Sequence, residues 1–197
     1  MFHLTKPDRA DIDHFIEANK DSGFSYPFIG KTKRGFPGSK HPGTKSYNVD
    51  RNRIIIGHGD EDWEKAKEAV RNWKMFDMPW VELYWPDTPI EEDRTVAILI
   101  RHFGFYSLNA ARIVYTIDEP NKLGFAYGTL AQHGESGEER FSVEFDQKTG
   151  EVWYDLYAFS KPNHFLSKLG YPLVRSLQKQ FAADSKIAML RAMSTIG

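Results

Sequence analysis

A run of short strand-like segments followed by one long helical stretch limits the fold more than any other feature of this sequence. Between residues 80 and 159, short apolar segments alternate with turn-forming residues. The connections are short, so neighbouring strands are predicted to pair antiparallel in hairpins and a meander. The predicted strands are Trp80–Trp85, Thr95–His102, Ala110–Ile117, Leu123–His133, Glu138–Asp146 and Glu151–Phe159, with turns at 118–121, 134–137 and 147–150.

Helical periodicity returns after the last predicted strand. Pro162 opens a helical stretch that ends near Met193, and Gly170-Tyr171-Pro172 must break or kink it because proline removes a backbone donor. One face is kept apolar by Leu173, Leu177, Phe181, Ala188 and Ala192. A long C-terminal helix packed on a strongly curved antiparallel sheet is the economical arrangement, so the predicted fold class is α+β. The space between the sheet and the helix can be a cavity.

The first part of the chain is predicted to be an extension of this domain. Residues 1–46 would form a short helix, which starts near Thr5 and ends near Asn19, and a Gly/Pro/Lys-rich loop over Gly30–Thr44. Residues 47–197 would form the domain itself. It would open with a strand in Tyr47–Gly57 and an amphipathic helix over Asp60–Met75.

The loop Gly30–Thr44 carries the only basic cluster of the sequence. Its charged residues are Lys31, Lys33, Arg34 and Lys40, with His41 and Lys45 adjacent. The cluster indicates either a contact with an anion or phosphate, or a solvated loop balanced by acids elsewhere.

The composition excludes several kinds of chemistry. The 197 residues include no cysteine, which removes thiol nucleophiles, Cys-based metal sites and disulfides. Lys and Arg number 26 against 27 Asp and Glu, so the chain has no basic excess and is a poor candidate for nucleic-acid binding. The seven histidines show no metal-ligand spacing, and we expect no metal.

A glycine-containing turn at Gly57-His58-Gly59 resembles the start of a dinucleotide-binding turn. However, Asp62 occupies the third glycine position, with Asp60 and Glu61 beside it, and three carboxylates would repel a phosphate. We therefore expect no cofactor.

The sequence indicates a cytoplasmic protein that does not span a membrane. Its first residues lack the basic-then-apolar pattern of a signal peptide. The longest apolar run, Val96 to Ile100, is far too short for a transmembrane helix.

Several motifs in order resemble a known family over roughly Tyr47 to Ala192. They are Gly57-His58-Gly59, Tyr127-Gly128-Thr129-Leu130, Gly137-Glu138-Glu139, Glu151-Val152-Trp153-Tyr154, Phe159-Ser160-Lys161-Pro162 and Leu169-Gly170-Tyr171-Pro172. The chain resembles uncharacterised protein family 0548, a domain of unknown function found in bacteria and plants, which has no established activity. The order of its elements resembles the helix-grip fold of START and Bet v 1-like proteins. The resemblance implies a helix-grip-like domain over 47–197 that holds a sterol, lipid or aromatic molecule between the sheet and the last helix.

His133 and Glu139 form the sharpest candidate pair for chemistry. If the hairpin pairs Ala131 with Phe141, His133 and Glu139 share one face, whereas Arg140, Ser142 and Glu144 face solvent on the other. An imidazole beside a carboxylate could transfer protons or orient a ligand. Alternatively, the pair is a structural hydrogen bond that pins the turn.

Aromatic residues make up 14% of the chain and either fill a core or line a pocket. We favour a non-enzymatic binder of a small apolar or aromatic ligand or a lipid. Its predicted ligand-binding residues are Tyr127, Thr129, His133, Glu139, Tyr157, Leu173, Leu177 and Phe181. One alternative is a cyclase- or hydrolase-like enzyme that uses His133 and Glu139, with no catalytic residue assigned. The other is a protein-interaction module that uses the Gly30–Thr44 loop.

Overall fold

The computed structural model describes residues 1–37, 42–131, 133–163 and 171–195, and it is built on one curved antiparallel sheet. Seven strands follow the order β2-β8-β7-β6-β5-β4-β3, and β1 pairs with β5. The strands are β1 (Phe2–His3), β2 (Asn48–His58), β3 (Val81–Tyr84), β4 (Thr95–Arg101), β5 (Tyr106–Glu119), β6 (Lys122–Thr129), β7 (Glu135–Asp146) and β8 (Glu151–Pro162). The helices are α1 (Arg9–Asn19), α2 (Lys31–Arg34), α3 (Gly59–Arg71) and α5 (Tyr171–Thr195), with the 3₁₀ helices η2 (Pro42–Thr44) and η3 (Lys74–Phe76).

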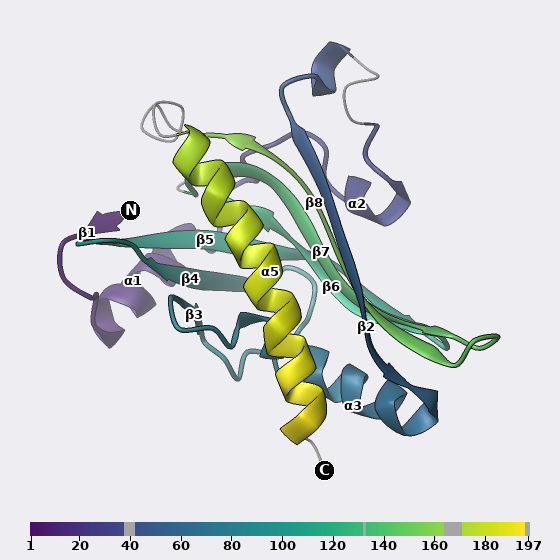
Figure 1. The fold of residues 1–197 in the computed structure, drawn as a ribbon. Helices are drawn as coiled ribbons and strands as arrows, with labels where there is room; N and C mark the ends of the chain where they lie inside the picture. Colours follow the sequence, from purple (N-terminus) through teal and green to yellow (C-terminus); the bar gives the residue numbers. More distant parts are fainter. Residues whose placement is uncertain (38–41, 132, 164–170, 196–197) are drawn as a thin grey trace.

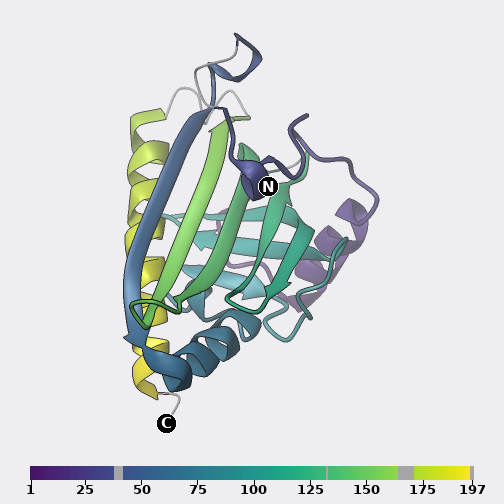
Figure 2. The same ribbon diagram turned by 90° about the vertical axis from the view of Figure 1, so that its right-hand side faces the viewer.

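The sheet curls around α5, which lies against its concave face (Figure 1). In Figure 2, α5 and α1 lie on opposite sides of the sheet. The predicted α+β fold, with a curved antiparallel sheet and a long C-terminal helix, is confirmed. Register shifts between Ile55 and Gly57 in β2 and between Ile113 and Tyr115 in β5 add to the curl, because bulges bend a strand. No helix in the described part of the chain is long and apolar enough to cross a membrane.

The hairpin between β6 and β7 differs from the prediction. Phe141 pairs with Phe125, whereas its expected partner was Ala131. In the same register, Tyr127 pairs with Glu139. The segment 134–137, predicted as a turn, mostly belongs to β7, and β6 ends earlier, at Thr129. The cause is the partner strand: β8 extends to Pro162 and supplies a backbone partner for every residue from Glu135 onward. Pro162 therefore closes a strand, and the prediction that it opens the helix is wrong.

The helices also differ from the prediction in detail. Asp8, not Thr5, caps α1, because its carboxylate accepts a hydrogen bond from the backbone N–H of Asp11 at 2.9 Å. The predicted helix over 60–75 ends at Arg71, and Trp73 then takes a left-handed conformation (φ 54°) before η3. The predicted break at Gly170-Tyr171-Pro172 begins outside the described residues, which resume at Tyr171.

The convex face of the sheet is covered by the N-terminal segment, residues 24–36. The ring of Phe36 stacks on Phe159 of β8 with centroids 4.0 Å apart, and Tyr26 and Tyr47 pack around this pair. The prediction that Arg140 and Ser142 face solvent is therefore wrong, because both are buried beneath this cover. Within the loop predicted over Gly30–Thr44, α2 and η2 are helical, and residues 38–41 lie outside the described chain.

The concave face carries the main hydrophobic core. Phe125, Phe141 and Tyr154 on the sheet pack with α3, η3 and the second half of α5. The predicted apolar stripe of α3 is confirmed, since Trp63, Ala66 and Val70 are all buried in this core. The core fills only part of the space between the sheet and α5, and the rest is a cavity.

Candidate functional site

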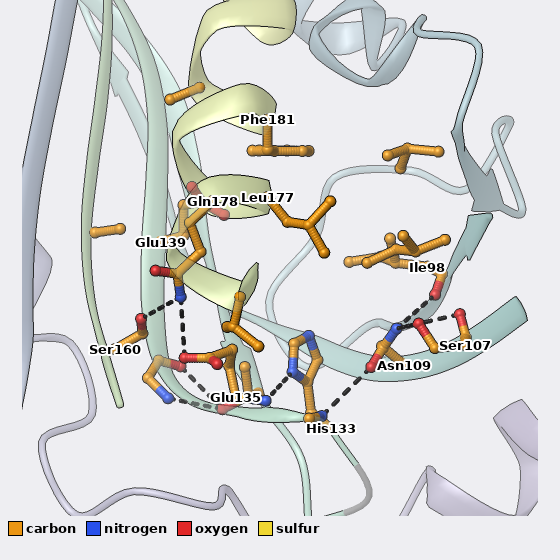
Figure 3. A pocket seen from close by; sticks show the side chains of 18 of the residues that line it. Ile98, Ser107, Asn109, His133, Glu135, Glu139, Ser160, Leu177, Gln178 and Phe181 are labelled. Carbon is orange, nitrogen blue, oxygen red and sulfur yellow. Dashed lines mark hydrogen bonds between the residues drawn. The ribbon is translucent and has the colours of Figure 1, made fainter. Parts of the chain in front are cut away.

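A cavity of about 990 Å³ lies between the concave face and the first half of α5 (Figure 3). Its size is at the upper end of the roughly 300–1,000 Å³ typical of small-molecule sites. Residues from strands β2 to β8 and from α5 line it, together with the first residues of the chain.

Most of the wall is apolar. Ile98 of β4 faces Leu177 and Phe181 of α5 across the cavity (Figure 3), and Ile100 of the same strand also lines it. Phe181 also packs against the ring of Trp80, with centroids 6.4 Å apart. These side chains offer a ligand dispersion contacts and removal from water.

At the rim of the cavity, apolar side chains are exposed to solvent. Phe2 packs edge-on against Phe105, with centroids 5.8 Å apart, yet remains half exposed. Leu4 is 87% exposed and Leu173, at the start of α5, is 64% exposed. An apolar rim of this kind favours the entry of an apolar molecule.

Glu139 carries the principal polar group of the sheet wall. Its Oε2 accepts a hydrogen bond of 2.6 Å from the hydroxyl of Tyr127, the residue opposite it on β6. Burial raises the pKa of Glu139 to about 7; the Tyr127 hydrogen bond opposes this shift, and the nearby charge of Asp50 adds to it. Burial also raises the pKa of Tyr127 well above its ordinary value, so this phenol stays a donor.

A second polar group joins β7 to α5. The side-chain amide of Gln178 donates to Glu135 Oε2 and to the Ser160 hydroxyl, both at 3.0 Å. Burial raises the pKa of Glu135 to about 7, against the opposing effects of these hydrogen bonds and of Arg175. Arg175 itself binds both carboxylate oxygens of Asp50, at 2.7 and 2.8 Å.

His133 lies at the opposite end of the cavity from Phe181 (Figure 3). Its Nδ1 accepts a hydrogen bond from the backbone N–H of Glu135 at 3.0 Å, which requires Nδ1 to be unprotonated. Next to it, the backbone N–H of Gly134 donates to Asn109 Oδ1 at 3.4 Å. This hydrogen bond holds the ring against the backbone of β7.

Seven of the eight predicted ligand-binding residues line the cavity. They are Tyr127, Thr129, His133, Glu139, Leu173, Leu177 and Phe181. The hydroxyl of Thr129 is already used, since it donates to the Gly137 carbonyl at 3.1 Å and accepts from the Gly137 N–H at 2.9 Å. Whether any of the seven binds a ligand stays a prediction.

The structure places two groups of the predicted site elsewhere than expected. Tyr157 lies on the convex face, where its hydroxyl accepts a 2.9 Å hydrogen bond from the backbone N–H of Phe36. His133 and Glu139 do not form a pair: Glu139 bonds to Tyr127, and His133 bonds to the backbone of Glu135. The pair depended on a hairpin register that the structure does not have.

Sequence reasoning missed the polar groups supplied by Glu135, Gln178, Arg175 and Asp50. A signal for Glu135 was available, because it precedes Glu139 by four residues and strand residues two apart share a face. It was hidden by the prediction of a turn at 134–137. The others come from β2 and α5 and are brought to β7 only by the curl of the sheet. In the described residues, no group of three His, Asp or Glu side chains could hold a metal.

Comparison with known proteins agrees with this architecture. The model for the domain of unknown function DUF1990 matches residues 25–188. A UPF0548 protein of Dictyostelium discoideum is 36% identical and covers 99% of this chain and 97% of its own length. A UPF0548 protein of Arabidopsis thaliana is 38% identical over 88% of this chain and 84% of its own.

Among solved structures, human STARD10 superposes with a TM-score of 0.51 at 9% identity, over 98% of this chain and 82% of that one. This likeness concerns the fold alone and supports a START-like, helix-grip arrangement. The sequence matches go further, since they span most of both chains at more than a third identity. The chain therefore belongs to the uncharacterised UPF0548 family, whose domain is DUF1990.

Proposed function

We propose that this protein binds a small apolar or aromatic molecule, or the apolar part of a lipid, in the cavity between the sheet and α5. The observation that carries the proposal is a space of about 990 Å³ with mainly apolar walls and a few polar groups in fixed positions. An empty apolar space of this size costs a protein stability, because the surrounding side chains lose packing contacts. A ligand would restore those contacts.

In this proposal the lining residues have two roles. Leu173, Leu177 and Phe181 of α5 cover the ligand, and Ile98 supports it from the sheet. Glu139, held by Tyr127, orients its polar group. The separation of His133 from Glu139 removes the geometric basis of the acid–base hypothesis, so binding is favoured over catalysis.

The experiment is saturation binding of N-phenyl-1-naphthylamine, an uncharged probe that fluoresces in apolar sites. Wild-type protein should bind it with one-to-one stoichiometry. Leu177→Trp should weaken binding at least tenfold, because the indole fills the space between α5 and the sheet. Leu190→Trp is the matched control: it lies on the same helix, is 37% exposed and does not line the cavity.

Equal probe affinity in the two tryptophan variants would contradict the proposal, as would wild-type protein that binds no probe. Native mass spectrometry of the protein purified from cells adds a second measurement. It should detect a non-covalent small molecule that Leu177→Trp fails to retain and Leu190→Trp keeps.

A further inference from the structure

The acidic groups of the cavity outnumber the cationic groups that could balance them. Glu135 and Glu139 point from the same face of β7, and Asp50 aligns with Glu139 across the sheet because both pair with Ala158 of β8. Arg175 is the guanidinium at this wall, and Asp50 holds it through both carboxylate oxygens. Two of the three carboxyl groups are therefore left without an ion pair in the described part of the chain.

The hydrogen bonds of these two carboxyl groups are also incomplete. Among the described residues, only the Tyr127 hydroxyl bonds to the side chain of Glu139, and it uses Oε2. The Oε2 atom of Glu135 accepts a hydrogen bond from the Gln178 amide, whereas its Oε1 atom is buried without a partner in the described structure. A carboxylate removed from water is costly unless donors or a cation compensate it.

Among the described residues, neither of the two Lys or Arg side chains that line the cavity supplies that cation. Arg51 turns to the convex face, where its Nε binds Asp155 at 2.9 Å. Lys179 is exposed at the rim. Burial lowers the pKa of His102, which favours its neutral form, and the Nδ1 of His133 accepts the hydrogen bond from the Glu135 N–H.

We propose that the ligand is a cationic amphiphile, with a protonated amine that binds Glu139 and an apolar body that lies against Leu177 and Phe181. This inference rests on the proposed ligand-binding function and specifies its ligand class. The Oε1 atom of Glu139 would accept the ammonium N–H while Tyr127 holds Oε2. An anionic head group, such as a carboxylate or phosphate, would be repelled by the same wall.

The test compares three ligands with one twelve-carbon chain: dodecylamine, dodecanol and dodecanoate. Each competes with N-phenyl-1-naphthylamine for the wild-type protein at pH 8. Dodecylamine should displace the probe with at least tenfold higher affinity than dodecanol, and dodecanoate should be weakest. The shared chain cancels the apolar contribution, so the ranking reports the head group alone.

Glu139→Gln provides the matched change at the site. Glutamine keeps the size of the side chain and an oxygen that accepts the Tyr127 hydrogen bond, so the fold is retained. Dodecylamine affinity should fall about tenfold, and dodecanol affinity should stay the same. Glu144→Gln is the control, because it removes the same charge from β7 outside the cavity, where Glu144 pairs with Arg53 and Lys122. It should change neither affinity.

A pH series gives an independent readout. The groups that face Glu139 are Tyr127 on β6, Tyr154 on β8, Asp50 on β2 and, through Asp50, Arg175 on α5. Burial raises the pKa of both tyrosines, so they stay neutral between pH 6 and pH 8. Dodecylamine stays protonated over this range, whereas Glu139 and its neighbour on the same face of β7, Glu135, both lose their protons near pH 7. Amine affinity should therefore fall about tenfold from pH 8 to pH 6, and dodecanol affinity should not change.

The outcomes separate the ligand class from the function itself. If dodecanoate binds as tightly as dodecylamine, or if Glu139→Gln leaves the amine unaffected, the cationic class is overturned and the cavity remains a binding site. If the protein binds neither the probe nor any of the three ligands, the proposed function is overturned as well.

Discussion

Glu138 and Glu139 are neighbours on β7 that face opposite sides of the sheet, and their surroundings differ completely. The carboxylate of Glu138 is 2% exposed and accepts hydrogen bonds from the Tyr26 hydroxyl, the Gly30 N–H, and both the N–H and the hydroxyl of Thr32. Within the described chain, Glu139 accepts one hydrogen bond, from the Tyr127 hydroxyl. The convex carboxylate is satisfied by the protein, whereas the concave one keeps capacity for a ligand.

The contrast extends to the residues around each glutamate. On the convex face, Asp155 binds Arg140 at 2.6 Å and Arg51 at 2.9 Å, and Arg140 also donates to the Thr32 carbonyl at 2.9 Å. The bond from Arg140 to Thr32 ties the N-terminal segment to the sheet. On the cavity face, Gln178 joins Glu135 and Ser160 to the Arg175–Asp50 pair, but in the described residues Glu139 bonds to Tyr127 outside this network. A buried network of this kind stabilises a fold, while an incompletely bonded group in a cavity is available for recognition.

The largest expected effect is a difference in stability between alanine variants of the two glutamates. Glu138→Ala leaves the donors of Tyr26, Gly30 and Thr32 without an acceptor, and should lower the free energy of unfolding by about 3–5 kcal/mol. Glu139→Ala should cost less than about 1 kcal/mol, because water can enter the cavity and solvate Tyr127. Urea denaturation of both variants measures the difference, and equal losses would contradict the contrast between the faces.

The next effect is a dependence of stability on pH. Burial raises the pKa of Glu139 in the fold from 4.5 to about 7, so between these values the native state binds more protons than the unfolded state. Stability should therefore fall as pH rises through this range. In Glu139→Gln, the free energy of unfolding should fall less over this range, by up to about 3 kcal/mol. Each pH unit between the two pKa values contributes roughly 1.4 kcal/mol to this difference. Denaturation midpoints at pH 5 and pH 8 test this, and a variant with an unchanged slope would refute it.

A smaller effect should follow from adding one methyl group on the convex side. A Cβ on Gly128 would lie 2.1 Å from the Tyr26 hydroxyl and 2.9 Å from the ring of Phe24. Gly128→Ala should thus push the N-terminal segment outward and cost about 1–3 kcal/mol. Probe affinity in the cavity should not change, since the methyl points away from it. Thermal unfolding and probe titration of the same sample would check both expectations. A lower probe affinity in Gly128→Ala would show that the two faces of the sheet are not independent.

The smallest effect compares two tyrosines. Tyr157→Phe removes the acceptor of the Phe36 N–H on the convex face, and should cost about 1 kcal/mol without altering ligand binding. Tyr127→Phe removes the donor to Glu139 and should change the affinity for dodecylamine. Thermal unfolding and ligand competition distinguish the two variants. A loss of binding in Tyr157→Phe alone would mean that the faces are assigned wrongly.

Much of the architecture could be predicted from local patterns. Period-two alternation located the strands, and the apolar spacing of Leu173, Leu177 and Phe181 identified the helical face that lines the cavity. Strand ends were less predictable, as the segment 134–137 shows. Its glycines and polar residues are typical of a turn, but pairing with β8 keeps most of it extended. A strand continues where it finds a partner, and the partner is not visible in the segment itself.

The site divides in the same way. Alternation along β7 determines that Glu138 and Glu139 point to opposite faces, since successive side chains in a strand do so whatever surrounds them. The surroundings of each carboxylate depend on residues far away in the sequence. Tyr26 and Glu138, which bond to each other, are 112 residues apart, and Arg175 and Asp50 are 125 residues apart. Local sequence therefore determined the direction of each carboxylate. Contacts that form only when the chain has folded decided that one is satisfied by the protein and the other faces a cavity.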